Sequence, residues 1–250
     1  MLNDKSLKQT ALDDFADTVY INDTTGENFI ENSIHTENFP SLLKKLSPKT
    51  RILECGYGEG TITAPLVERG YSVEIVEGSA KLCKEARERF GNKVLVHESL
   101  FETFLPTQLY DSVLALHVLE HVDEPRQVIK EISSWLTDGG VVVAVVPNAQ
   151  SLHRQLAVMM ELQPTIDHLS PRDKIVGHQR VYSLDELASD FESAGLVVEE
   201  RFGYFLKIIP NSMMRDWSPE LLRALTVISE ELPPHLLANI GIVARKPITE

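Results

Sequence analysis

The sequence predicts an α/β protein whose central sheet is mostly parallel and carries helices on both faces. Short apolar segments alternate with amphipathic helical segments between residues 50 and 147. The apolar segments have hydrophobic side chains at successive positions, which is typical of parallel strands buried on both faces. A chain of 250 residues, 43% of them hydrophobic, is also long enough to bury a large core without disulfides or metals.

The chain is expected to form one domain, residues 1–250, with three kinds of segment. Residues 1–44 are polar and weakly periodic and form an N-terminal cap, and residues 45–147 form the core. The segments 148–182 and 205–234 are longer than ordinary loops, so we expect them to cover a substrate as helical lid inserts.

Each element follows from a local pattern. The cap should contain a turn and a short helix at 24–32, and a helix at 37–46 that Pro48 stops. Apolar runs predict core strands at 50–55, 72–77, 93–98, 110–117 and 141–147. Helical periodicity predicts helices at 61–70, 79–91 and 124–140, the second capped by Ser79 and closed by Gly91. Beyond the core we expect helices at 151–162 and 183–195, strands at 196–205 and 235–246, and one helix within 205–234.

The charge and cysteine content exclude several classes of function. Lys and Arg number 24 and Asp and Glu 37, so the formal net charge is −13, which repels phosphate backbones and anionic membranes. We therefore expect neither nucleic acid nor a membrane as a partner. Cys55 and Cys83 are too few for a disulfide framework, and the polar first residues lack a signal-peptide core. These features predict a cytoplasmic protein, and a homodimer is one expectation for its assembly.

The most informative segment is the glycine-rich turn after the first core strand. Gly56, Gly58 and Gly60 stand where a buried strand must turn sharply into a helix. Glycine permits a positive φ there and lets a ligand approach the backbone. A dinucleotide-binding G-x-G-x-x-G pattern would need glycine at position 61, which is Thr61, and an acid, Glu54, ends the strand.

A second acid, Glu77, ends the next predicted strand, seventeen residues after Gly60. A carboxylate in this position can accept hydrogen bonds from both hydroxyls of a ribose lying over the glycine turn. The alternative is a tight turn beside a solvated glutamate. The combination of strand, glycine turn, helix and acid favours a nucleoside-binding site.

With these motifs the chain resembles the class I S-adenosylmethionine-dependent methyltransferases, in particular the branch that acts on small molecules. The resemblance covers roughly residues 45–204 and includes the segments LEHV and AGL. It implies a seven-stranded Rossmann-like sheet with one antiparallel strand, S-adenosylmethionine as cofactor and S-adenosylhomocysteine as product. The chain departs from the common pattern at Tyr57 and Glu59, which replace smaller residues, and at Glu98, where Asp is commoner.

The resemblance also implies which residues hold the cofactor. The turn would hold the methionine part, Glu77 the ribose, the end of the third strand the adenine, and the end of the fourth strand would lie near the sulfonium. Tyr20 in the cap is similar to a residue that closes over the cofactor in some relatives. The predicted cofactor-binding residues are Glu54, Gly56, Tyr57, Gly58, Gly60, Glu77, Gly78, Ser79, Glu98, Ser99, Leu100, His117, Val118 and Tyr20.

Residues 117–121 match H-x-x-E-H, a zinc-protease motif in reverse order. That chemistry needs both histidines on one helix, whereas this segment follows a strand and precedes the start of a helix at Pro125. A divalent ion held by His117, Glu120 and His121 is a further alternative, but this ligand set is incomplete. We therefore expect no metal, and we expect these residues to orient the loop and line the pocket.

The candidates for contact with the methyl acceptor lie mainly in the lid segments. His178 is the first candidate for a general base and His153 the second, while Arg154, Arg180, Tyr182 and His121 are expected to bind the acceptor. Two Arg–His pairs in a chain of net charge −13 suggest an acidic or polyhydroxylated acceptor. The alternative is that both arginines pair with acids such as Asp167, Asp173 or Asp185.

Together these features predict transfer of a methyl group to a small metabolite. Oxygen, in a hydroxyl or an acidic group, is the first acceptor atom, and a small-molecule N-methyltransferase is the alternative. A nicotinamide-dependent oxidoreductase and a non-catalytic cofactor-binding partner protein are alternatives of other classes. The residue at position 61 argues against the oxidoreductase, and the intact motifs argue against a protein without activity.

Overall fold

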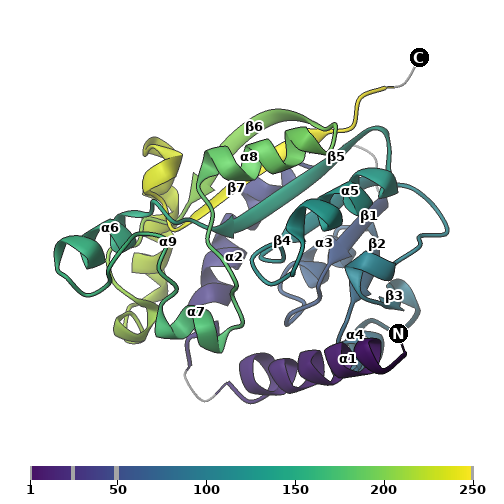
Figure 1. The fold of residues 1–250 in the computed structure, drawn as a ribbon, viewed down its shortest axis with the longest axis horizontal. Coiled ribbons are helices and arrows are strands. Elements are labelled where there is room, and N and C mark those ends of the chain that lie inside the picture. The colour runs from purple at the N-terminus through teal and green to yellow at the C-terminus, as the bar shows by residue number, and fades with distance from the viewer. Residues whose placement is uncertain (1, 24–25, 48–50, 249–250) are drawn as a thin grey trace.

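Seven strands form one mixed sheet in the computed structural model, which describes residues 2–23, 26–47 and 51–248. The strand order is β3-β2-β1-β4-β5-β7-β6, and β7 alone runs antiparallel to its neighbours (Figure 1). The strands are β1 (Arg51–Cys55), β2 (Ser72–Glu77), β3 (Leu95–Glu98), β4 (Tyr110–Leu116), β5 (Leu136–Pro147), β6 (Val197–Tyr204) and β7 (Asn239–Arg245). The predicted seven-stranded fold with one reversed strand is confirmed.

Helices cover both faces of the sheet because successive side chains of a buried strand point to opposite sides. Leu53 and Val113 face the core under α5 and α8, whereas Ile52 and Leu114 face the core under α2 and α3. α4 covers Ile75 of β2. The covering helices are α2 (Asn28–Leu43), α3 (Thr63–Glu68), α4 (Ala80–Phe90), α5 (Pro125–Trp135) and α8 (Leu184–Ser193).

The N-terminal cap contains more helix than the sequence pattern predicted. α1 (Leu2–Ala16) continues into a π-helical turn (Asp17–Ile21), and the predicted helix at 37–46 is the second half of α2. α1 packs closely against the loop after β2. A Cβ on Gly78 in this loop would lie only 2.5 Å from Leu12 Cδ1 of α1. The predicted stop at Pro48, the first residue of the strand predicted at 50–55 and part of the turn at 24–26 lie outside the described residues.

The helix predicted at 124–140 is too long. α5 ends at Trp135, and Leu136 already belongs to β5, where it pairs with Tyr110 of β4. The next residues are hydrogen-bonded to distant segments: Thr137 Oγ1 donates to the carbonyl oxygen of Tyr110 at 3.2 Å, and Arg245 Nη1 donates to the carbonyl oxygen of Gly139 at 2.7 Å. These tertiary hydrogen bonds override the helical pattern.

The two lid inserts extend from the carboxyl-end side of the sheet (Figure 1). The first contains α6 (Leu152–Met159) and the short α7 (Pro171–Ile175), which the sequence pattern did not predict. The second contains α9 (Pro219–Ile228), which packs on α2, and short 3-10 turns at Asn211–Met213, Ser229–Glu231 and Pro234–Leu236. Among the described helices, none combines the length and the hydrophobicity that a membrane-spanning helix requires.

Candidate cofactor and acceptor site

A large cavity of about 930 Å3 lies at the carboxyl ends of the parallel strands, between the cap and the lid inserts. Loops at this edge converge because parallel strands all end there. The predicted cofactor residues in its wall are Glu54, Gly56, Tyr57, Gly58, Glu77, Gly78, Ser79, Ser99, Leu100, His117, Val118 and Tyr20. The predicted acceptor-side residues in its wall are His121, His153, Arg154 and His178. Gly60, Glu98, Arg180 and Tyr182 do not line it.

The glycine turn has the backbone conformation that its sequence requires. Gly56 has a φ of 80°, Gly58 of 55° and Gly60 of 67°. Residues other than glycine rarely adopt this backbone conformation. A Cβ on Gly58 would lie 3.8 Å from the Tyr20 ring, so the cap residue stands over the turn. Gly60 serves packing instead, because a Cβ there would lie 2.7 Å from the ring of Tyr57.

Glu77 anchors this turn through its carboxylate. The side chain is buried, with 7% of the residue exposed. Its Oε2 accepts a hydrogen bond from the backbone N–H of Tyr57 at 2.9 Å, and its Oε1 accepts one from that of Ser79 at 2.7 Å. Burial raises the pKa of Glu77, and these backbone hydrogen bonds oppose the rise. An ionised carboxylate has about four lone-pair sites, so both oxygens can still accept hydrogen bonds from a ligand.

Glu54, at the end of β1, is a second buried acid beside the cavity. Only 5% of the residue is exposed, and Thr63 Oγ1 donates a hydrogen bond to its Oε2 at 2.5 Å. Burial raises the pKa of Glu54 to about 8. The carboxyl group is therefore mostly protonated at neutral pH and adds little negative charge to the cavity.

The end of β3 contributes only part of what was predicted. Ser99 and Leu100 line the cavity, but Glu98 is exposed on the outside and its Oε2 lies 3.3 Å from Arg87 Nη1. Glu98 therefore forms a surface ion pair and is removed from the candidate site.

The end of β4 holds a histidine in an unusual backbone conformation. His117 has a φ of 55°, its Nδ1 lies 3.1 Å from Glu120 Oε1, and its Nε2 lies 3.2 Å from the hydroxyl of Tyr204. Burial alone would lower the pKa of His117, but the hydrogen bond and the charge of Glu120 raise it. Glu120 is completely buried, and its Oε2 has no hydrogen-bond partner within the described segments.

In the first lid insert, Asp173 organises the acceptor side. Arg154 Nη2 donates to its Oδ2 at 2.7 Å, and His178 Nδ1 lies 2.9 Å from its Oδ1. Hydrogen bonds from His178 and Ser170 and the charge of Arg154 hold the pKa of Asp173 low against its burial. Arg154 also donates to the carbonyl oxygen of His168 at 2.9 Å. The guanidinium of Arg154 therefore stabilises the lid insert. This agrees with the alternative in which the arginine pairs with an acidic residue of the chain.

Two predicted acceptor contacts serve the structure instead. Arg180 Nη1 donates to the carbonyl oxygen of Leu119 at 2.9 Å, and its Nη2 donates to that of Asp123 at 3.2 Å. It therefore braces the loop between β4 and α5. Tyr182 is 4% exposed within the core under α5 and α8. Both residues therefore lie outside the candidate acceptor site, because neither side chain lines the cavity.

Sequence reasoning missed Lys207, which follows β6 in the second insert and lines the cavity. It is half-buried, and burial lowers the pKa of its ammonium group while Glu31 opposes the change. Among the described residues, no hydrogen bond or ion pair of this ammonium group is found. No local pattern around position 207 could have identified Lys207, since only the fold brings it to the cavity beside the first lid insert.

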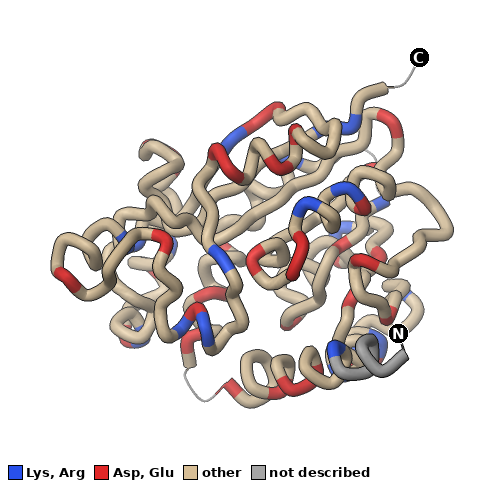
Figure 2. Tube along the Cα trace, in the orientation of Figure 1, with Lys and Arg blue, Asp and Glu red and all other residues tan. Residues whose placement is uncertain are grey.

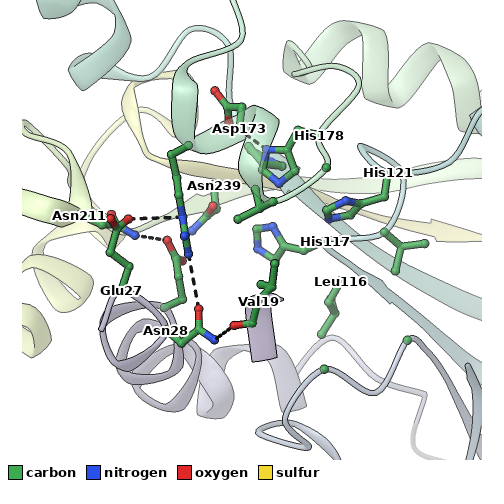
Figure 3. A pocket seen from close by; sticks show the side chains of 18 of the residues that line it. Val19, Glu27, Asn28, Leu116, His117, His121, Asp173, His178, Asn211 and Asn239 are labelled. Carbon is green, nitrogen blue, oxygen red and sulfur yellow. Dashed lines mark hydrogen bonds and ion pairs between the residues drawn. The ribbon is translucent and has the colours of Figure 1, made fainter. Parts of the chain in front are cut away.

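Figure 3 shows His117, His121 and His178 on one side of the pocket and a polar network on the other. In that network Asn28 Nδ2 donates to the carbonyl oxygen of Val19 at 2.5 Å, and Arg172 Nε lies 3.4 Å from Glu27 Oε2. The network joins the start of α2 to α7.

Known proteins share both the sequence pattern and the fold. A methyltransferase domain matches residues 31–201, which is more than half of the chain. An uncharacterized methyltransferase of Geobacillus sp. strain WCH70 is 28% identical over 169 residues, covering 64% of this chain and 77% of that protein. The tRNA 5-carboxymethoxyuridine methyltransferase of Escherichia coli strain K12 is 31% identical over 137 residues, covering 51% of this chain and 52% of that protein.

The structure agrees with this assignment. An S-adenosylmethionine-dependent methyltransferase from Mesorhizobium loti superposes with a TM-score of 0.62 at 16% identity, covering 84% of this chain and 98% of that one. Because the domain match spans most of the sheet and the glycine turn and Glu77 line the cavity, the chain belongs to the methyltransferase-domain family and is a class I S-adenosylmethionine-dependent methyltransferase.

Proposed function

We propose that this enzyme transfers the methyl group of S-adenosylmethionine to an oxygen atom of an acidic small metabolite bound under the lid inserts. The observation that carries the proposal is the continuity of the cavity. One volume of about 930 Å3 reaches from the glycine turn to Lys207 and the His178–Asp173 pair. This lies near the upper end of the ~300–1,000 Å3 typical of small-molecule sites, which leaves room for cofactor and acceptor together.

The cofactor end fits the nucleoside and amino-acid parts of S-adenosylmethionine. Glu77 retains lone pairs for the ribose hydroxyls, and the absence of a Cβ at Gly58 leaves the backbone open to the methionine part. Ser99 and Leu100 would flank the adenine, while His117, Val118 and Tyr20 would enclose the sulfonium end. When bound, the cofactor supplies an activated methyl group, so the protein mainly positions the acceptor and excludes water.

Among the residues that the structure describes, the acceptor end offers one cation without an ion-pair partner, Lys207. The charges of Arg154 and Arg172 are balanced by Asp173 and Glu27, at 2.7 Å and 3.4 Å. A half-buried ammonium group is costly unless it meets an anion, so Lys207 would bind a carboxylate or another acidic group of the acceptor.

His178 is the proposed proton acceptor. Its Nδ1 is held by Asp173 at 2.9 Å, so its Nε2 is left to take a proton from an acceptor hydroxyl during an in-line displacement. His153 is the weaker candidate, because burial, together with the charges of Lys207 and Arg154, lowers its pKa to about 2.

Other acceptors remain alternatives with their own support. An amine acceptor would use the same cavity. The name of the Escherichia coli relative includes a tRNA nucleoside with an acidic substituent, which supports an RNA acceptor as well as an acidic one. The net charge of −13 and the mixing of Lys and Arg with acidic residues in the view of Figure 2 favour a small molecule.

The free, buried thiols of Cys55 and Cys83 support a cytoplasmic location.

The test uses S-adenosylmethionine with a labelled methyl group and a cell extract separated into small molecules and RNA. We expect label in the small-molecule fraction as an ester or ether. Lys207→Met should raise the acceptor KM at least tenfold without changing affinity for S-adenosylhomocysteine, whereas Lys130→Met, on the exposed face of α5, should change neither. Label in RNA or on nitrogen would replace the proposed acceptor, and an unchanged KM in Lys207→Met would remove the anion contact.

A further inference from the structure

We propose that Glu120, His121 and His178 form a binding site for one divalent transition-metal ion, with zinc as the first choice, in the wall of the cavity. One potential ligand atom from each residue lies within 4.8 Å of the others. His121 and His178 also line the cavity (Figure 3). Two imidazoles and one carboxylate are a common three-ligand set for catalytic zinc, which keeps its fourth position open to a substrate or water.

The carboxylate gives the first independent reason to expect an ion. Glu120 is 0% exposed, its Oε1 lies 3.1 Å from His117 Nδ1, and its Oε2 has no hydrogen-bond partner in the part of the chain that the structure describes. A buried carboxylate oxygen without a partner is unfavourable, because it has lost its hydration without compensation. A metal ion would supply the missing contact.

The two histidines are oriented as metal ligands usually are. His178 Nδ1 is held by Asp173 at 2.9 Å, and the ring of His121 is hydrogen-bonded to the backbone of Gly177. Metal-binding histidines almost always use their second ring nitrogen in this way, which fixes the tautomer and aims the first nitrogen at the ion.

His117 is excluded from this ligand set. Its two ring nitrogens already contact Glu120 and Tyr204, at 3.1 Å and 3.2 Å. It instead orients the carboxylate of Glu120. The ligand that completes the set is His178, which comes from the lid insert and is 57 residues away from His121 in sequence.

The three ligand atoms would have to move closer together to bind an ion. Ligands of a tetrahedral zinc at ~2.1 Å are about 3.4 Å apart, so separations of up to 4.8 Å require shifts of about 1 Å. The rings of His121 and His178 are 4.8 Å apart between centroids, and small side-chain rotations would supply such shifts.

Binding of the ion does not depend on the proposed function. The role that this location gives the ion does depend on it. An ion between the histidines would face the acceptor end of the cavity, where it could bind an acceptor oxygen and lower the pKa of its hydroxyl. In that state His178 Nε2 is a ligand, so the proton of the acceptor hydroxyl would pass to a water molecule instead. The same position thus activates oxygen either with the ion or through the histidine alone.

The experiment uses the full chain after removal of metals with a chelator. Calorimetric titration with zinc chloride should show one saturable site, and cobalt chloride should give the visible absorption of a low-coordinate nitrogen–oxygen site. Magnesium chloride should give no comparable heat, because magnesium prefers oxygen ligands. Both His178→Ala and Glu120→Gln should weaken zinc binding at least tenfold.

The matched control is His168→Ala, an exposed histidine of the same lid insert, which should bind zinc like the wild type. Affinity for S-adenosylhomocysteine, measured on every variant, shows that each one is folded and separates this inference from the proposed function. His178→Ala provides the test by itself if Glu120→Gln does not fold. The absence of saturable zinc binding, or equal zinc binding in the wild type and His178→Ala, would overturn the site.

Discussion

Replacing Glu77 by Gln is the most direct perturbation of the proposed cofactor site. The carboxylate ends β2, is 7% exposed and binds the backbone N–H groups of Tyr57 and Ser79 at 2.9 Å and 2.7 Å. Glutamine keeps the size of the side chain but has one acceptor oxygen and no charge. The variant should therefore lose charge-assisted hydrogen bonds to the ribose hydroxyls while it keeps the packing around the turn.

The magnitude follows from the number of hydrogen bonds at risk. A hydrogen bond to a charged group contributes about 1.5–3 kcal/mol, and each 1.4 kcal/mol is about tenfold in a dissociation constant. We expect the Kd for S-adenosylhomocysteine to rise about 10- to 100-fold in Glu77→Gln. Burial raises the pKa of Glu77, so on acidification its carboxylate should become protonated at a pH above the usual range for glutamate. The proton would then take the place of the hydrogen bonds from the ribose hydroxyls. The affinity of the wild type for S-adenosylhomocysteine should therefore fall in that pH range. In Glu77→Gln this pH dependence should be absent.

The assay is calorimetric titration with S-adenosylhomocysteine over a range of pH, with thermal unfolding of each variant to verify the fold. The matched control is Glu98→Gln, the same chemical change at the end of the adjacent strand β3, where the carboxylate is exposed and pairs with Arg87. A Kd for Glu77→Gln within twofold of the wild type would refute the ribose contact. Equal weakening in Glu98→Gln would show that the effect is not specific to the cavity.

Three further predictions concern the turn, the lid and a buried acid. Gly58→Val should weaken binding of S-adenosylhomocysteine more than tenfold, whereas Gly70→Val, which also has a positive φ but lies in open space, should only lower the Tm; equal affinities in calorimetry would contradict this. His178→Asn should lower kcat at least tenfold and change the Kd of S-adenosylhomocysteine less than threefold; a wild-type kcat in steady-state assays would move proton removal elsewhere. Because burial raises the pKa of Glu54 from 4.5 to about 8, its stabilisation of the fold is complete below pH 4.5 and is lost toward pH 8. The free energy of unfolding of the wild type relative to Glu54→Gln should therefore decrease across that range in urea unfolding, and a constant difference would argue against a raised pKa.

Local patterns predicted the core elements well because the hydrophobic pattern of a segment reflects which of its own side chains are buried. β2 spans the predicted residues 72–77, and Ser79 caps α4 by accepting a hydrogen bond from the backbone N–H of Leu82. The prediction failed where a distant segment decides the backbone, as at Leu136, which leaves the helical pattern to pair with Tyr110. α1 was missed because its polar sequence has only weak periodicity.

The candidate site divides in the same way. The glycine turn and Glu77 could be identified from sequence because a strand, a turn and a second strand tip suffice to define them. The acceptor side could not, because Arg154 and Arg180 have the same local appearance whether they face a ligand or the protein. The structure directs Arg154 to Asp173 and Arg180 to backbone carbonyl groups.

The sequence by itself determined the fold class, the family and the cofactor end of the cavity. These depend on hydrophobic periodicity and on the φ that glycine permits, both of which are properties of short segments. Only the tertiary structure decided that Lys207 reaches the cavity without an ion-pair partner in the described part of the chain, and that His178 meets Glu120 and His121. Such contacts join residues far apart in the chain, so their distances and their charge balance exist only after the sheet has brought the inserts together.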